Sequence, residues 1–451
     1  MENIGMPGIV AKSEKKQPDQ VFETADEVAA FLDRLWPLPR SITGEGVRAS
    51  HDILGEILPL HRIEVPSGTR CFDWTVPKEW IVREAYVVTP TGERILDFGE
   101  NNLYLVNYSM PFRGRMTRQE LDSRLFSLPD MPEAVPYRTS YYKEDWGFCI
   151  SQKQRDSLAE GEYEVVVDSD LVDGSMTISE CVLPGETEKE VLLSTYTCHP
   201  SMANNELSGP LVTALLARRL TALPRRRLTY RFVFQPETIG AIATLQRIGD
   251  HLRENLVAGY VVSCVGDVGS FTYKRSRRGD TLADRACEYI LATSGHPFEI
   301  IDFHPMGSDE RQYCSPGFDL PVGVLTRSLP ATYPQYHTSL DNLDAISFEA
   351  ICESVDMYYR LCLLLDRNRV YQNQVMYGEP HLSKYDLYPT LGGSADTRFE
   401  VGDILWLMSL ADGSRDLLAI AERSGSEFDR LAELAQRCVE AGLLKAEEVE
   451  A

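Results

Sequence analysis

The stretch Thr195-Tyr-Thr-Cys-His199-Pro-Ser-Met-Ala-Asn-Asn205-Glu206-Leu-Ser-Gly209 decides how this chain of 451 residues is interpreted. The apolar run before it, Val191 to Leu193, is typical of a buried strand, and the Ala- and Leu-rich segment after it predicts a helix. A histidine and a carboxylate therefore stand where a strand gives way to a helix. In α/β folds, this edge of the sheet is where binding and catalytic side chains gather.

The same alternation of strand and helix continues along the chain. Strands are expected at 190–197, 228–234, 257–264, 297–303 and 321–326, with helices at 207–221, 240–252, 281–294 and 346–366. Such alternation predicts an α/β fold, with a mostly parallel sheet and helices on both faces. A helical pair within residues 24–59 is expected to pack on the same sheet, which makes this domain discontinuous.

Changes in composition suggest four further boundaries. We expect a disordered leader at 1–20, the discontinuous α/β domain at 21–60 and 179–370, an inserted β domain at 61–178, and a small winged helix at 395–451. The inserted segment shows short alternating runs separated by turn signals. Its many aromatic residues are expected to form its own core, the alternative being a lid over a substrate cleft.

Charge and cysteine usage restrict the class of protein. A net charge of −23 argues against a nucleic-acid partner, and no apolar stretch is long enough to span a membrane. The ten cysteines form no CxxC pair, which favours a reduced, cytoplasmic protein. Residues 398–451 hold twelve acidic and six basic side chains, so we expect the winged helix to pack within the molecule, form a homo-oligomer or dock a partner protein rather than bind DNA.

Candidate site residues follow four predicted strands. His199, Asn205 and Glu206 come first, then Glu237, then Asp267, and finally His337 and Asp341 before the last helix. Imidazole and carboxylate groups are ligands that zinc accepts, and a further carboxylate can act as a general base. Taken singly, each residue also has an ordinary structural interpretation, such as a strand-end histidine, a turn aspartate or a surface pair.

The order of these motifs resembles a known family. The chain carries His199, then Asn204-Asn-Glu-Leu-Ser-Gly209, Pro236-Glu-Thr-Ile-Gly240, Gly266-Asp267, Gly307-Ser-Asp-Glu310 and Tyr336-His-Thr-Ser-Leu-Asp-Asn342. This order is similar to the zinc aminopeptidase family with co-catalytic metals. It resembles more closely the bacterial aminopeptidase-like proteins with an inserted β domain and a C-terminal winged helix. Residues 39–46 and 273–277 also look like that group, and the resemblance spans about 21–446.

The resemblance implies a metal site with two departures. His199, Asp267 and His337 match metal ligands, and Glu237 matches the general base. Asn205 stands where the family has a bridging aspartate, and Thr238 stands where it has a second acidic ligand. We therefore expect one zinc per chain rather than two, with Glu206 replacing the lost aspartate as a ligand or orienting one.

Further roles are expected from the same resemblance and placement. Asp341 would hold the second nitrogen of His337, Asp309 or Glu310 would receive a substrate ammonium, and Tyr336 would face an oxyanion. Arg275, Arg277 and Arg311 would hold a carboxylate, although solvated surface charge explains them equally well.

The expected activity is zinc-dependent hydrolysis of an amide in a small peptide or aminoacyl conjugate. The alternatives are a non-hydrolytic zinc enzyme or pseudo-enzyme scaffold, and, less favoured, a winged-helix regulator.

Overall fold

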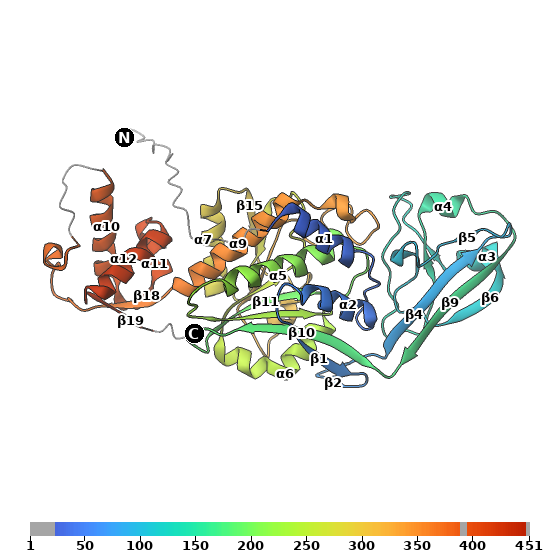
Figure 1. Ribbon diagram of the computed structural model, residues 1–451, viewed down its shortest axis with the longest axis horizontal. Helices are drawn as coiled ribbons and strands as arrows, with labels where there is room; N and C mark the ends of the chain where they lie inside the picture. The colour runs from blue at the N-terminus through green and yellow to red at the C-terminus, as the bar shows by residue number, and fades with distance from the viewer. Residues whose placement is uncertain (1–22, 388–394, 448–451) are drawn as a thin grey trace.

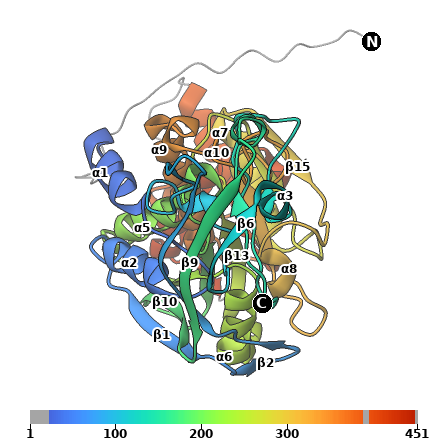
Figure 2. The same ribbon diagram turned by 90° about the vertical axis from the view of Figure 1, so that its right-hand side faces the viewer.

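The protein is an elongated molecule of three parts in this computed structural model, which describes residues 23–387 and 395–447. The α/β unit lies in the middle, the winged helix lies at one end and the β-rich insertion lies at the other (Figure 1). In the view from the insertion end, β6 (Phe112–Thr117) and β9 (Glu162–Val172) stand in front of the main sheet (Figure 2). The expected leader at 1–20 lies outside the described residues.

The central sheet has eight strands. Their order is β1 (His61–Pro66), β10 (Ser175–Leu183), β12 (Thr229–Gln235), β11 (Glu190–Tyr196), β13 (Leu256–Val262), β16 (Val322–Thr326), β14 (Phe271–Lys274) and β15 (Phe298–Ile301). The four strands from β12 to β16 are parallel to one another, while β10 and β14 run against their neighbours in this block. The predicted mostly parallel α/β fold is therefore confirmed.

Helices cover both faces of this sheet. One face carries α1 (Ala25–Leu35), α2 (Glu45–Leu54), α5 (Ser208–Thr221), α7 (Leu282–Ser294) and α9 (Phe348–Arg367), and the other carries α6 (Ile239–Asn255) and the short α8 (Glu310–Tyr313). The start of α1 follows its sequence signal, because the Thr24 hydroxyl accepts a hydrogen bond from the backbone of Glu27. Each face buries its own apolar core.

The insertion is built on an antiparallel sheet in the order β5 (Arg94–Ile95), β4 (Glu79–Val88), β9 and β6. Smaller elements surround it: β2 (Arg70–Cys71), β3 (Trp74–Thr75), η1 (Asn102–Tyr104), α3 (Arg118–Asp122), β7 (Leu125–Phe126), β8 (Phe148–Cys149) and α4 (Gln152–Asp156). The expected boundary at residue 61 falls one strand too early, because β1 pairs with β10 inside the main sheet.

The C-terminal unit contains three helices and a three-stranded sheet. Its elements are β17 (Val370–Asn373), η4 (Leu382–Tyr385), α10 (Ala395–Leu410), β18 (Asp412–Asp416), α11 (Leu417–Ser424), α12 (Phe428–Glu440) and β19 (Leu444–Glu447). The sheet begins with β17, before the expected start at 395, because β17 pairs with both β18 and β19. Within the described residues, no helix is long and apolar enough to cross a membrane.

Candidate functional site

Three of the four predicted strand-end segments contribute to one cleft of about 700 Å³. His199 follows β11, Glu237 and Thr238 follow β12, and His337 lies in the loop before α9. The opposite wall comes from the insertion, which supplies Trp74, Tyr137, Arg138, Tyr141 and Tyr142. Part of the insertion therefore covers the sheet edge, as the lid interpretation of its aromatic residues anticipated.

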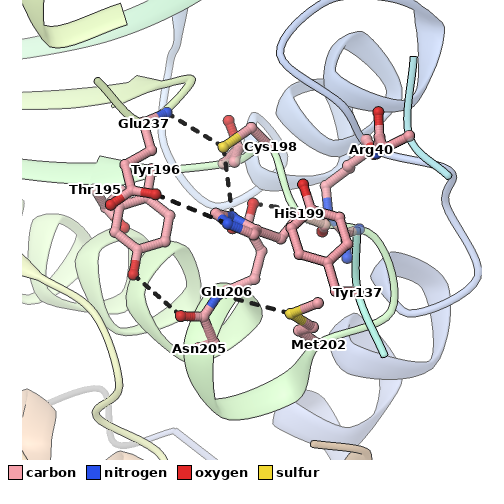
Figure 3. A network of polar contacts seen from close by, with 12 residues as sticks. Arg40, Tyr137, Thr195, Tyr196, Cys198, His199, Met202, Asn205, Glu206 and Glu237 are labelled. Atoms are coloured by element: carbon pink, nitrogen blue, oxygen red, sulfur yellow. Dashed lines mark hydrogen bonds and ion pairs between the residues drawn. The ribbon is translucent and has the colours of Figure 1, made fainter. Parts of the chain in front are cut away.

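His199 is held from one side and open on the other. Its Nδ1 lies 2.8 Å from Glu206 Oε2, and its Nε2 lies 3.8 Å from Glu237 Oε2 (Figure 3). Burial lowers the pKa of His199 to about 3, so the ring is neutral at neutral pH. A neutral ring fixed through one nitrogen presents a defined lone pair or proton at the other.

Behind His199 lies a buried ion pair. Glu206 Oε1 is 3.9 Å from Arg40 Nε, and Arg40 also donates hydrogen bonds to the backbone carbonyls of His199 and Leu35. Burial raises the pKa of Glu206 to about 8, and the Arg40 guanidinium works against that rise. Arg40 lies in the segment 39–46 that carried the resemblance, but it was not among the predicted site residues.

Glu237 enters the cleft from a strained turn. Thr238 adopts φ 64° and ψ −75°, and the Ile239 N–H donates to the Glu237 carbonyl at 2.8 Å, which together define a γ-turn of the rare positive-φ form. The buried Asp309 accepts the Thr238 N–H at 2.7 Å and holds the turn in place. Burial raises the pKa of Glu237 to about 7, and Arg311 works against that rise.

His337 presents an unsatisfied nitrogen. Among the described residues, its buried Nε2 has no hydrogen-bond partner. Its ring lies 5.1 Å from the His199 ring and 5.3 Å from the Tyr137 ring, measured between centroids, and Tyr336 stacks on it at 3.9 Å. Burial lowers the pKa of His337 to about 3. Tyr336 thus packs against His337, and it does not appear among the described residues that line the cleft.

Asp341 and Asp267 do not take the expected positions. Asp341 accepts the backbone N–H groups of Asn204 and Asn205 at 2.7 and 2.9 Å, so it caps the turn η2 (Ala203–Leu207) rather than holding His337. Asp267 accepts hydrogen bonds from the Asn204 amide at 2.5 Å and the Ser328 hydroxyl at 3.0 Å. Asp267 follows β13 as predicted, but its side chain is engaged in a loop network.

Three other residues expected in the pocket are used elsewhere. Glu310 forms a buried ion pair with Lys274 at 2.6 Å. Arg275 pairs with Glu288 and Asp302, and Arg277 pairs with Asp319, at part-exposed positions. Of the expected arginines, Arg311 alone lines the cleft in the described structure.

Cys198, the neighbour of His199, also lines the cleft. Its Sγ accepts the Glu237 N–H at 3.2 Å, and ligand atoms of Cys198, His199 and Glu206 lie within 4.8 Å of one another. Burial raises the pKa of the Cys198 thiol well above its ordinary value. A protonated thiol is a poor nucleophile and a poor metal ligand.

A zinc ion suits the donors on the Nε2 side of His199. The two neutral imidazoles of His199 and His337 lie near each other there, with the Glu237 carboxylate beside them, and His337 Nε2 is buried without a partner among the described residues. Three of the positions expected from a two-metal site differ from it in charge or in contacts. Asn205 and Thr238 carry no charge to offset two dications, and the Asp267 carboxylate is occupied by Asn204 and Ser328.

Comparisons with known proteins agree with this architecture. Residues 29–368 match a family model described as a domain of unknown function (DUF4910), and residues 369–446 match a winged helix-turn-helix model. A Clostridium acetobutylicum protein, provisionally named for polysaccharide biosynthesis with an aminopeptidase-like domain, is 44% identical over 423 residues, covering 94% of this chain and 97% of its own.

Solved structures also share this architecture. A C. acetobutylicum crystal structure, provisionally named a peptidase, superposes with a TM-score of 0.87 at 42% identity, covering 94% of this chain and 96% of its own. A zinc aminopeptidase from Bacillus subtilis shares the fold, with a TM-score of 0.55 at 14% identity, covering 76% and 95%. The chain therefore belongs to the DUF4910 family, with an aminopeptidase-like domain followed by a winged helix.

Proposed function

We propose that this protein is a single-zinc amide hydrolase whose metal is held by His199 and His337, with Glu237 as the general base. The observation that carries the proposal is the unsatisfied, buried Nε2 of His337 beside the cleft that His199 and Glu237 line. Glu206 supports His199 through Nδ1 in this account, and Asp267 is not a ligand. Zinc, when bound, supplies positive charge that polarises an amide carbonyl and acidifies water.

The chain's own residues supply the proton transfers. In this account Nδ1 of His199 carries the proton and donates to an ionised Glu206, which leaves the Nε2 lone pair available on the side of Glu237. Glu237 takes a proton from the attacking water and passes it to the leaving nitrogen.

The substrate we propose is a small peptide or aminoacyl conjugate, handled in the cytoplasm. The cleft of about 700 Å³ suits a small molecule, and all ten cysteines are unpaired thiols. Neither nucleic acid nor membrane is part of the proposal. The winged helix would serve protein docking or self-association.

A second candidate is an amide attached to a sugar. The Clostridium relative is named for polysaccharide biosynthesis, and two aromatic rings at the cleft, Trp74 and Tyr142, are exposed and packed edge to face at 5.7 Å. Flat exposed rings are the surfaces on which sugar rings stack.

The substitution Glu237→Gln tests the proposal. It keeps the size of the side chain and removes the base, so turnover of an amide substrate should fall by about 10²-fold or more while zinc content stays the same. Glu186→Gln, which removes an exposed carboxylate on the far side of β11, serves as the control. If zinc is lost in step with turnover, Glu237 is a ligand and the assignment is wrong.

A further inference from the structure

Two arginines line the cleft although the chain is strongly acidic, and one of them, Arg311, also acts electrostatically on Glu237. Arg138 is the other, and within the described residues neither guanidinium has a carboxylate at ion-pair distance. Arg275 and Arg277, by contrast, are neutralised by surface carboxylates. In a chain of net charge −23, two arginines left unpaired in one cleft point to an anionic ligand.

Arg311 is fixed and incompletely bonded. One Nη2 hydrogen donates to Thr238 Oγ1 at 3.1 Å, and its buried Nε has no hydrogen-bond partner among the described residues. Arg138 is exposed and stacks its guanidinium 3.9 Å above the Phe126 ring, and within the described residues this guanidinium has no hydrogen-bond partner. Stacking and tethering restrict both side chains before any ligand binds, so less entropy is lost on binding.

The carboxylates near the cleft that could recognise a free amino terminus each bond a protein group at one oxygen or both, and none of the three lines the cleft, although Asp309 Oδ2 and Glu206 Oε1 have no hydrogen-bond partner among the described residues. Asp309 accepts the Thr238 N–H, Glu310 pairs with Lys274, and Glu206 contacts His199. All three are buried. Among the cleft-lining residues that the structure describes, the acidic side chain is Glu237, which the proposed function uses as the base.

We infer that the substrate is recognised by an anionic group bound between Arg311 and Arg138, and not by a free ammonium. This inference rests on the proposed function, because the anion is placed beside the bond that Glu237 acts on. The class of substrate is then an N-acylated acid or an acidic conjugate. A carboxylate and a phosphate share this chemistry, since both accept paired hydrogen bonds from a guanidinium.

Binding measured without turnover tests the inference. Calorimetric titration of the Glu237→Gln protein compares N-acetylglycine with N-acetylglycinamide, which differ in the charge of one group. The acid should bind about tenfold or more tightly, and Arg311→Gln or Arg138→Gln should remove that preference. Arg277→Gln, at a part-exposed pair outside the cleft, should leave it intact. A titration with inorganic phosphate under the same conditions shows whether Arg311 and Arg138 bind a phosphate more tightly than a carboxylate.

Equal binding of acid and amide would overturn the inference, and this comparison needs no arginine variant to fold. Retained preference in folded Arg311→Gln and Arg138→Gln proteins would overturn it too.

Kinetics separate this inference from the proposed function. If the protein hydrolyses free-amine substrates faster than N-acylated acids, the inferred anion site is wrong while the proposed hydrolase activity stands. If the anion binds in an arginine-dependent way and no substrate is hydrolysed, the proposed hydrolase activity is wrong while the inferred anion site stands.

Discussion

At the scale of single residues, the support behind His199 is the buried contact between Arg40 and Glu206. Arg40 is 1% exposed and lies beside Glu206, which has no contact with solvent to replace a lost partner. Removing one member of a buried ion pair leaves the other uncompensated. Arg40 reaches the site from the loop between α1 and α2, far from the strand ends that define the rest of the site.

We predict that Arg40→Gln lowers the free energy of unfolding by about 3 kcal/mol, because Glu206 loses the neighbouring positive charge and two carbonyl groups lose their donor. Urea unfolding followed by circular dichroism measures this change. Arg34→Gln is the matched control, since Arg34 forms an exposed pair with Glu56 and its loss should change stability little. A small effect at Arg40 would mean that Glu206 is neutral in the folded protein.

Sequence predicts which residues reach a sheet edge better than where their side chains point. His199, Glu237, His337 and Arg311 do line one cleft. Asp267 also follows a strand, but Asn204 and Ser328 draw its carboxylate away, and the sequence carries no signal for those contacts. The walls supplied by Tyr137 and Arg138 were also missed, because they come from an insertion that contacts the site only in three dimensions.

At the scale of elements, the junction between β12 and α6 stores strain beside the base. A threonine with positive φ at the centre of a γ-turn costs roughly 1–3 kcal/mol relative to an ordinary conformation. Asp309 offsets this cost by accepting the Thr238 N–H. The strain therefore fixes the direction in which Glu237 leaves the strand.

Thr238→Gly should raise the free energy of unfolding by roughly 1 kcal/mol, since glycine adopts positive φ with little penalty. Turnover should fall, because the Arg311 contact to the Thr238 hydroxyl disappears. The control Thr293→Gly lies in α7, where glycine should instead destabilise the helix by about 1 kcal/mol. Denaturant titration measures the free energy of unfolding of both variants. A lower value for Thr238→Gly than for the wild type would show that Thr238 is not strained.

Long periodic elements were the ones that sequence predicted well. The strands β11, β12, β13, β15 and β16 and the helices α5, α6, α7 and α9 all appear close to their expected ranges. β14 was missed because it is four residues long and polar at one end. β1 was assigned to the insertion because pairing with β10, more than a hundred residues later, leaves no mark on local pattern.

At the scale of the whole molecule, each accessory unit extends one of the two apolar cores. The core on the α5 and α9 face continues into the winged helix, and the core on the α6 face continues into the insertion. At the first of these junctions, the α12 backbone at Phe428 donates to Tyr289 of α7, and Asp429 pairs with Arg367 of α9. The start of α12 is thus covered by the α/β unit.

Asp416 anchors the winged helix by accepting hydrogen bonds from Arg285 and Asn368 while capping α11. We predict that Asp416→Ala lowers the stability of this unit by roughly 2 kcal/mol and gives it a separate, earlier melting transition in calorimetry. Asp412→Ala, an exposed position on the same strand, should leave one transition. Unchanged melting of the Asp416 variant would show that apolar contacts alone hold the unit.

The same contact should fail in acid. Burial works to raise the pKa of Asp416, but hydrogen bonds from Arg285 and Asn368 outweigh it and hold the pKa below its ordinary value. A carboxyl group with a lowered pKa stabilises the fold above its unfolded pKa of about 3.9 and loses this contribution as the pH falls through the folded value. The early transition should therefore also appear in the wild-type protein below about pH 4.

Zinc content per chain tests the central account most directly. Elemental analysis of untagged protein, after incubation with zinc and removal of excess metal, is made on the wild type, His337→Ala and His304→Ala, the last at a loop position outside the cleft lining. The account predicts about one zinc in the wild type and in His304→Ala, and none in His337→Ala. Two zinc ions in the wild type, or zinc retained without His337, would contradict it.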